Sequence, residues 1–454
     1  MSGQILSSPT VLQSLIAHLD RPVSATTRAR AARHLLDWLA CAYAGAHTDN
    51  GKKFAAMAAL GAQGHCTTLG SEPRDWWHAL QVNASVGNML EMDDLHRSSI
   101  LHPGPVIVPA AVAIAEQVGA SAGGLLDAIV RGYEATIRIG RAMGAAHYRF
   151  FHNTSTCGTF GAAAAAADLL GLSADQTAWA LANAGSRTGG LWQMRFEACE
   201  TKSLHNAQAA QCGVQAALLA QHGVRGPMSL LEGTQGLFAA MAAGANPREV
   251  VASTETEDEH WMIDEVSFKP WPACRHAHPT IDAALALRTR VAIEGIASIE
   301  VHTYQSALDF CDQPNPVTEL QAKFSLQHCA ATALLNGTPW LQHFAVAALN
   351  EPQLRALRER VSVHEAGDMT SQFPQHYGAR VVVKLHDGTS MSHDQPDALG
   401  DPELPLSDAQ VRDKARKLFA SAGFEESAPL IDATLHLASE SAHRPITAWT
   451  ALWP

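Results

Sequence analysis

Apolar side chains recur at the spacing of an amphipathic helix through most of the first half of the chain. Between Thr26 and Ala46 they return every three or four residues, and Gly45 is typical of a helix end. The same pattern predicts further helices over residues 107–120, 123–145, 157–170, 174–184 and 206–222. No convincing alternation of apolar and polar residues precedes about residue 265, so this region is expected to be all-helical.

The pattern changes after about residue 265. Ile299, Val301 and Thr303 alternate with polar residues, as strand residues do when one face is buried. A β-branched run at 380–385 is followed by Asp387-Gly388 and a second short run, a combination that predicts a β-hairpin. Another alternating stretch begins at residue 361, and helices are expected over 279–290, 319–336 and 350–358.

These patterns predict a mostly α-helical protein with two domains. Residues 1–265 and 405–454 are expected to form a large all-helical domain, and residues 266–404 a smaller α+β domain. Ser407 is the expected N-cap of the helix that opens the last segment. Hydrophobic residues make up 47% and charged residues only 17% of the 454 positions, so the chain must bury a large core.

The charge balance excludes some classes of partner. A formal net charge of −12 is the wrong sign for a general nucleic-acid or anionic-membrane binder. No apolar stretch is long enough to span a bilayer, and the first twenty residues lack the features of a secretion signal. The eight cysteines are scattered without a CxxC pair, which indicates reduced thiols. A cytoplasmic protein that binds neither nucleic acid nor membrane is therefore expected.

Several common catalytic motifs are absent. No GxGxxG follows a predicted strand, the chain has no complete P-loop, and neither GxSxG nor HExxH occurs. Dinucleotide-dependent oxidoreductases, P-loop nucleotidases, serine hydrolases and zincins therefore lose their usual sequence support.

The first candidate for chemistry runs from Glu91 to Pro105. Three carboxylates and two histidines, His96 and His102, lie within twelve residues, and imidazole is the natural general acid or base near neutral pH. Pro103 and Pro105 are expected to keep the end of this stretch out of a helix. An acidic helix end followed by a solvated loop explains the same residues equally well.

Two further candidates lie at predicted helix starts. His152 and the hydroxyl-rich residues 153–156 open an alanine-rich helix, where free N–H groups would receive a carboxylate. Simple N-capping by Asn153 or Ser155 is the alternative. Lys202 and His205 are three residues apart and would share one helix face, although a single lysine is usually solvated.

A fourth candidate is the proline-rich stretch from Ser267 to Pro279. It contains Lys269, Arg275, His276 and His278, and a stiff backbone that holds cations in place suits the recognition of an anion. The pair His276-x-His278 also fits a metal site, but no paired carboxylates accompany it.

Together these stretches resemble the MmgE/PrpD family. The resemblance follows the order of the family along nearly the whole chain. The matching stretches are Leu36–Cys41, Asp93-Asp94, His102–Gly104, Thr154–Thr156, Thr201-Lys202, Leu230–Gly233, Lys269–Arg275, Pro316–Thr318, Ala322–Leu326 and Gly400–Pro402.

The resemblance implies a large helical domain and an α+β domain, usually in a homodimer, with an active site between them and no metal or organic cofactor. It implies small di- or tricarboxylates as substrates, which suit a local cluster of cations. By the resemblance Asp93, His102, His152, Lys202 and Lys269 are expected in the pocket as catalytic residues, and Tyr148 is a further candidate as a second base. The residues expected to bind substrate are His96, Ser155, Arg275 and His278.

The reaction expected from this resemblance begins with loss of a proton next to a carboxylate, and fixed cations must stabilise the enediolate that forms. A hydro-lyase of the 2-methylcitrate dehydratase type is the first expectation. An epimerase of an iminodisuccinate-like dicarboxylate, with Tyr148 or His102 as partner of Lys202, and a cis-aconitate-type decarboxylase are the alternatives.

The chain departs from the family pattern at two places. Leu95-His96 follows the Asp-Asp pair where dehydratase-like and decarboxylase-like members tend to have Thr-Trp, and Cys274 replaces a histidine of the decarboxylase-like pattern. The second departure weakens the decarboxylase hypothesis. Two other classes stay open, a metal-dependent hydrolase because of the 23 histidines, and a non-catalytic helical interaction protein.

Overall fold

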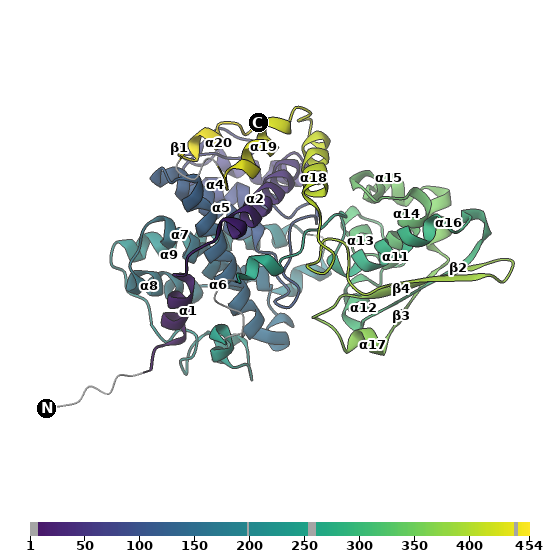
Figure 1. Ribbon diagram of the computed structural model, residues 1–454, viewed down its shortest axis with the longest axis horizontal. Coiled ribbons are helices and arrows are strands. Elements are labelled where there is room, and N and C mark those ends of the chain that lie inside the picture. The colour runs from purple at the N-terminus through teal and green to yellow at the C-terminus, as the bar shows by residue number, and fades with distance from the viewer. Residues whose placement is uncertain (1–7, 198, 253–259, 440–443) are drawn as a thin grey trace. The chain divides into compact units, whose positions relative to one another are not determined.

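A computed structural model describes residues 8–197, 199–252, 260–439 and 444–454 (Figure 1). Within these residues the chain forms two compact units. Unit 1 consists of Met1–Met89, Asp93–Val266 and Asp408–Pro454, and unit 2 of Leu90–Met92 and Ser267–Ser407. The chain is mostly helical, with a small mixed sheet in its C-terminal region, which confirms the predicted fold class.

Unit 1 is built almost entirely from helices. Their bounds are α1 (Val11–Leu19), α2 (Ala25–Ala46), α3 (Asp49–Ala58), α4 (Trp76–Val86), α5 (Gly104–Val118), α6 (Ala122–Tyr148), α7 (Asn153–Leu169), α8 (Ala174–Gly185), α9 (Thr201–Gln221), α10 (Leu237–Met241), α18 (Asp408–Ser421), α19 (Ala428–His436) and α20 (Thr447–Thr450).

Helix α7 forms the centre of unit 1 and packs against α5, α6, α8 and α9 (Figure 1). Its residues from Asn153 to Ala167 are all buried. Small side chains allow this close packing. A Cβ added at Gly161 would lie 2.5 Å from the Gly132 carbonyl oxygen of α6, and one at Gly213 of α9 would lie 2.6 Å from the Thr159 carbonyl oxygen. The alanine and glycine content of these helices therefore sets how near their backbones approach.

Two expectations about unit 1 were wrong in detail. Pro103 and Pro105 do not exclude a helix, because α5 begins at Gly104 with Pro105 in its first turn, where the missing N–H would have no partner in the helix anyway. A short strand, β1 (Gln63–Cys66), also forms and bridges to Arg74. Four residues are too few for the alternation of apolar and polar positions to reveal a strand.

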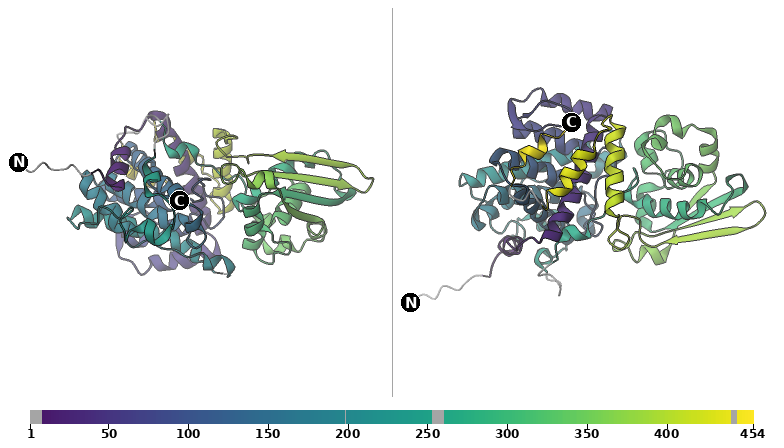
Figure 2. Two further views of the ribbon diagram at one scale, coloured as in Figure 1. Left: turned by 90° about the horizontal axis from the view of Figure 1, so that it is seen from below. Right: turned by 45° about the horizontal axis from the view of Figure 1, so that its top comes forward.

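The C-terminal segment packs on the first long helix of unit 1. Helices α18 and α19 pack on α2, as the right-hand view of Figure 2 shows. Inside this contact the Lys414 Nζ atom lies 2.5 Å from Asp37 Oδ1, and both side chains are buried. Helix α18 begins directly after Ser407, the predicted N-cap.

Unit 2 contains a four-stranded sheet in the order β3-β2-β4-β5. Its strands are β2 (Ile296–Thr303), β3 (Val361–Glu365), β4 (Ala379–Leu385) and β5 (Ser390–Gln395). Strand β2 pairs in parallel with β3 and antiparallel with β4. The predicted hairpin is confirmed, since β4 and β5 pair antiparallel around Asp387-Gly388, with Gly388 at a φ of 86°.

The helices of unit 2 are α11 (His278–Arg288), α12 (Gln305–Cys311), α13 (Glu319–Lys323), α14 (Leu326–Asn336), α15 (Val346–Leu349), α16 (Pro352–Arg358) and α17 (Gly367–Thr370). Helix α11 packs on β4 and β5, and α14 packs on β3. The predicted helix over 319–336 is divided at Ser325, whose hydroxyl accepts a hydrogen bond from the His328 N–H and so caps α14. A serine that offers the backbone another hydrogen bond ends one helix and starts the next.

Candidate active site

A tight loop brings Asp93 and His102 together, although nine positions separate them. His96 and Leu101 pair as an isolated bridge, and Ile100 between them has a φ of 50°. The Nδ1 atom of His102 then lies 2.8 Å from Asp93 Oδ2. Asp93 is 1% exposed, whereas the His102 side chain keeps 15% of its surface open. A carboxylate beside Nδ1 leaves the Nε2 atom as the part of the ring that can exchange a proton with a substrate.

The neighbouring Asp94 holds this loop in place. Its Oδ1 atom accepts a hydrogen bond from the Gly104 N–H at 2.9 Å. Its Oδ2 atom accepts hydrogen bonds from His34 Nδ1 at 2.8 Å and from the Tyr133 hydroxyl at 2.7 Å. Burial lowers the pKa of His34 to about 4 and raises the pKa of Tyr133, so both donors are neutral and protonated at pH 7. The first aspartate of the pair is thus placed by the second.

The start of α7 is joined to the same loop. The Asn153 side-chain amide donates to the Ser99 carbonyl at 2.9 Å, and the His102 N–H donates to Thr154 Oγ1 at 3.0 Å. His152 is the N-cap residue of α7, and its N–H donates to the Gly190 carbonyl at 2.9 Å. The hydroxyl-rich helix start predicted as a ligand site therefore also fixes the position of His102.

His152 meets a second histidine from α9. Its Nδ1 atom lies 3.2 Å from Nδ1 of His205, and its ring centroid lies 4.7 Å from that of Trp192. Burial lowers the pKa of His152 well below its ordinary value, and the charge of Lys202 lowers it further. His205 and His102 act in the same direction, while Asp93 opposes them. Unit 1 thus gathers Asp93, His102, His152 and Lys202 in one electrostatic neighbourhood.

The other three predicted site residues of unit 1 contact neighbouring rings, side chains and backbone. The Tyr148 ring packs edge-on against Trp192 at 5.5 Å, one ring removed from His152. The buried Ser155 hydroxyl donates to the His205 carbonyl at 3.2 Å. His96 is 1% exposed, and both of its ring nitrogens have protein partners, Ser99 at 2.7 Å and Glu265 at 3.3 Å.

Unit 2 contains the second lysine predicted to be catalytic. Lys269 is fully buried, and its Nζ atom lies 3.6 Å from Glu91 Oε2. Glu91 has a φ of 56°, which a residue other than glycine adopts only under strain.

The Cys274 thiol of unit 2 lies in the field of Lys269. Burial opposes ionisation of this thiol. Its hydrogen bond with Cys311 and the charge of Lys269 outweigh that effect and lower the pKa of Cys274.

Arg275 and His278, predicted to bind substrate, have partners inside unit 2. Arg275 is 3% exposed and forms an ion pair with Asp401. Its Nη1 atom lies 3.2 Å from His278 Nδ1, and His278 Nε2 lies 3.2 Å from the Ala273 carbonyl oxygen. Asp401 also accepts hydrogen bonds from the Ser267 hydroxyl at 2.6 Å and from the Ala398 N–H at 3.0 Å. These contacts hold both side chains in place within unit 2.

Among the described residues, one group of side chains has the spacing of metal ligands, and it lies outside the predicted site. His376, Asp397 and Glu403 of unit 2 bring one ligand atom each within 4.8 Å of the others. His376 Nδ1 already lies 2.8 Å from Asp397 Oδ1. No described helix combines the length and apolar character needed to cross a bilayer.

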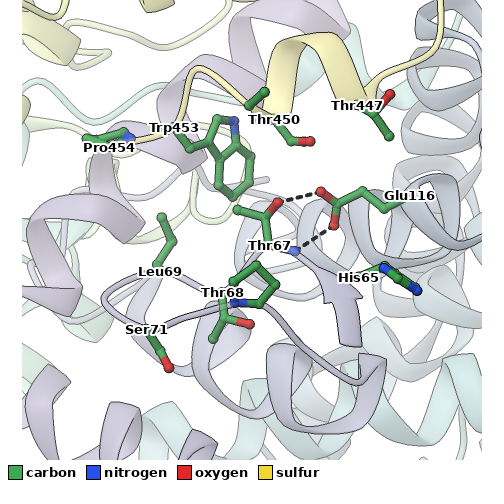
Figure 3. A pocket seen from close by; sticks show the side chains of 12 residues that line it. His65, Thr67, Thr68, Leu69, Ser71, Glu116, Thr447, Thr450, Trp453 and Pro454 are labelled. Atoms are coloured by element: carbon green, nitrogen blue, oxygen red, sulfur yellow. Dashed lines mark hydrogen bonds between the residues drawn. The ribbon is translucent and has the colours of Figure 1, made fainter. Parts of the chain in front are cut away.

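Unit 1 also has a pocket of about 400 Å³ that includes none of the predicted site residues (Figure 3). The Glu116 carboxylate at its edge accepts hydrogen bonds from the Thr67 N–H and hydroxyl, at 2.9 and 2.5 Å. The pocket is lined by His65, Thr67, Thr68, Leu69, Ser71, Pro73, Glu116, Thr447, Thr450, Ala451, Trp453 and Pro454.

Sequence reasoning assigned no separate role to two residues that shape the group of predicted site residues in unit 1. Asp94 is one of three carboxylates in the first candidate stretch, and His205 shares a predicted helix face with Lys202. The spacing of Lys202 and His205 did carry a signal, because residues three apart share a helix face. Nothing in the sequence indicated that His205 would meet His152, 53 positions away.

Comparison with known proteins gives a consistent result over nearly the whole chain. Residues 16–250 match the MmgE/PrpD N-terminal domain, and residues 271–440 match the MmgE/PrpD C-terminal domain. A cis-aconitate decarboxylase of Mus musculus is 29% identical over 412 residues, which cover 85% of this chain and 81% of the relative.

Two further relatives have similar names. The cis-aconitate decarboxylase-like protein oryM of Aspergillus oryzae is 28% identical over 86% of each chain. The human cis-aconitate decarboxylase is 30% identical over 75% of this chain and 72% of its own length.

Proposed function

This chain belongs to the MmgE/PrpD family, and we propose that it is a lyase acting on a small tricarboxylate of the cis-aconitate type. Its own side chains would carry out the acid–base chemistry. The family and the two-domain architecture expected from the sequence are confirmed by the matches to both family domains. The substrate class rests on the names of the relatives, which are decarboxylases.

One observation carries the proposal: the Asp93–His102 pair at 2.8 Å, in the electrostatic neighbourhood of His152 and Lys202. In decarboxylation of such a substrate, one C–C bond to a carboxylate breaks and CO₂ leaves. The electron pair shifts along the double bond, and a proton must reach the far carbon. His102, oriented by Asp93, is the group that we assign to this proton transfer.

The charges of the substrate fit the same residues. A tricarboxylate brings several negative charges into a protein whose formal net charge is −12, so binding requires local cations and hydrogen-bond donors. Lys202 supplies a positive charge next to His152, and the start of α7 adds the partial positive charge of a helix N-terminus. Such fixed donors also stabilise negative charge that develops on the remaining carboxylates during the reaction.

A hydro-lyase is the second candidate. Cys274 stands where decarboxylase-like members have a histidine, and its thiol lies in the field of Lys269. This departure from the decarboxylase-like pattern weakens the case for a decarboxylase and keeps dehydration open. The sequence by itself favours dehydration over decarboxylation, whereas the names of the relatives favour decarboxylation.

Proton NMR of the purified enzyme in D₂O tests the proposal. The samples would contain cis-aconitate, citrate, methylcitrate, tartrates and iminodisuccinate stereoisomers. Loss of cis-aconitate with formation of a deuterated dicarboxylate and CO₂ supports the decarboxylase. Loss or gain of water identifies a hydro-lyase, and deuterium entry with inversion alone identifies an epimerase. No reaction and no deuterium entry with any of these acids would contradict the proposed function.

A further inference from the structure

We propose that His205 is a positioning residue that keeps His152 in the tautomer protonated on Nε2, so that this ring presents a hydrogen-bond donor to a substrate carboxylate. The inference rests on the proposed function, because it takes His152 as part of the substrate site. His205 itself is not expected to touch the substrate.

The two rings face each other through their Nδ1 atoms. Nδ1 of His152 lies 3.2 Å from Nδ1 of His205. The two residues are 2% and 7% exposed. Two bare nitrogens would repel each other, and two N–H groups would clash, so one of the two Nδ1 atoms must carry the proton. The tautomers of the two rings are therefore opposite and coupled.

Both rings are neutral at pH 7. Burial lowers the pKa of His205, and burial together with the charge of Lys202 lowers the pKa of His152. The groups that act electrostatically on His152 come from two segments: Lys202 and His205 of α9, and Asp93 and His102 of the loop before α5. Three of the four disfavour a positive charge on His152. In a neutral pair each ring has one N–H. One ring therefore donates from Nδ1, and the other is protonated on Nε2.

The roles proposed for His102 and His152 decide which of the two Nδ1 atoms donates this hydrogen bond. His102 already pairs with a carboxylate through Nδ1, so its Nε2 atom serves proton transfer. The charge of Lys202 acts on His152, and a polycarboxylate held by these residues would bind through donors. If His205 donates from Nδ1, the Nδ1 atom of His152 is the acceptor, and its own proton must be on Nε2. A neutral imidazole of this kind can stabilise developing negative charge without losing its proton.

The backbone holds both rings in this arrangement. Helices α7 and α9 lie side by side (Figure 1), and the Ser155 hydroxyl of α7 donates to the His205 carbonyl at 3.2 Å. Gly190 lies against the pair with a φ of +124°, and a Cβ there would be 3.3 Å from His205 Nδ1. Glycine suits both the backbone conformation and the space. The contact is therefore built by two helices and a loop, rather than by the rings alone.

The test combines three variants of His205. H205A removes the donor, and H205L does so while retaining apolar volume. H205N keeps an amide near the position of Nδ1. Because loss of one preorganised donor typically costs about 10²–10³-fold in kcat, partial loss through misorientation of His152 should cost about 10–100-fold. KM should change less, and H205N should recover most of the loss. H328N is the matched control, because His328 is buried in unit 2 and contacts no residue of the proposed site.

A second readout does not depend on activity. In ¹⁵N-histidine NMR of the substrate-free protein, we expect His152 to be protonated on Nε2 and His205 on Nδ1, with His152 becoming a mixture of tautomers in H205A. A wild-type His152 protonated on Nδ1, or a folded H205A enzyme with unchanged kcat, would overturn the inference. If no acid of the panel reacts, the proposed function fails, while the NMR assignment still decides whether the coupled pair exists.

Discussion

Two stretches of this chain, one in each unit, have the same kinds of residue but use them differently. In unit 1, predicted site residues contact one another or another histidine, as in the Asp93–His102 and His152–His205 pairs. In unit 2, Arg275 is paired with Asp401, a carboxylate that is itself held by Ser267 and the Ala398 N–H. Breaking a buried ion pair whose carboxylate is itself held by hydrogen bonds destabilises the fold. Ionisable groups that face one another retain the capacity to exchange protons.

The energetic consequences of the two arrangements differ in the same way. Arg275 and Asp401 are 3% and 0% exposed, so removing one partner leaves a buried charge without compensation. The His102 side chain keeps 15% of its surface open, and a glutamine there still has an N–H that can donate to Asp93, so H102Q should cost less folding energy and affect mainly the reaction. Substitutions that separate activity from stability therefore test the comparison directly.

The largest expected effect is on turnover. H102Q should lower kcat by about 10²–10⁴-fold, because a positioned acid–base group contributes about that factor. Turnover of cis-aconitate and urea denaturation would be measured on the same preparation. The matched control is L39A. Leu39 is fully buried, and its truncation should destabilise the protein by about 2–5 kcal/mol without changing kcat per folded molecule. Equal losses of stability in both variants would contradict the assignment of His102.

The next effect is on stability in unit 2. R275M should lower the free energy of unfolding by about 3–5 kcal/mol, since Asp401 is then left without its cation. The double variant R275M/D401N should recover part of this loss, because no uncompensated charge remains. Urea denaturation measures both. A stable R275M protein with a KM raised tenfold or more would show instead that Arg275 binds substrate, as predicted from the sequence.

The smallest effect concerns pH and compares two buried histidines that the proposed reaction does not use. Burial lowers the pKa of His147 in unit 1 and of His328 in unit 2 to about 4, against about 6.5 in an unfolded chain. Between these values the unfolded state binds protons that the folded state does not. Stability should therefore fall as the pH drops from 6.5 towards 4.

Each of these histidines should contribute about 2 kcal/mol of that loss between pH 6.5 and 5. H147Q and H328Q should each flatten the dependence by that amount, as measured by urea denaturation at several pH values. An unchanged slope in either variant would mean that the corresponding ring is already protonated in the folded protein near pH 5.

Much of the fold was predictable because its signals are local. The periodicity of apolar residues from Thr26 to Ala46 corresponds to α2, which spans Ala25–Ala46, and Asp387-Gly388 predicted the β4–β5 turn. Errors arose where the local signal was short or ambiguous. Strand β1 has four residues, and a helix can have a proline in its first turn, as α5 does at Pro105.

The sequence by itself determined the fold class and the order of candidate residues, because hydrophobic spacing, turn residues and family-like stretches are all readable along one dimension. Only the tertiary structure decided which charges are already neutralised. Arg275 and His102 look alike in the sequence, yet one meets a fixed carboxylate 126 positions away, and the other meets Asp93 across a tight loop. The contact of His152 with His205 likewise depends on how α7 packs against α9. Electrostatic environment depends on distance in space, and distance along the chain does not determine it.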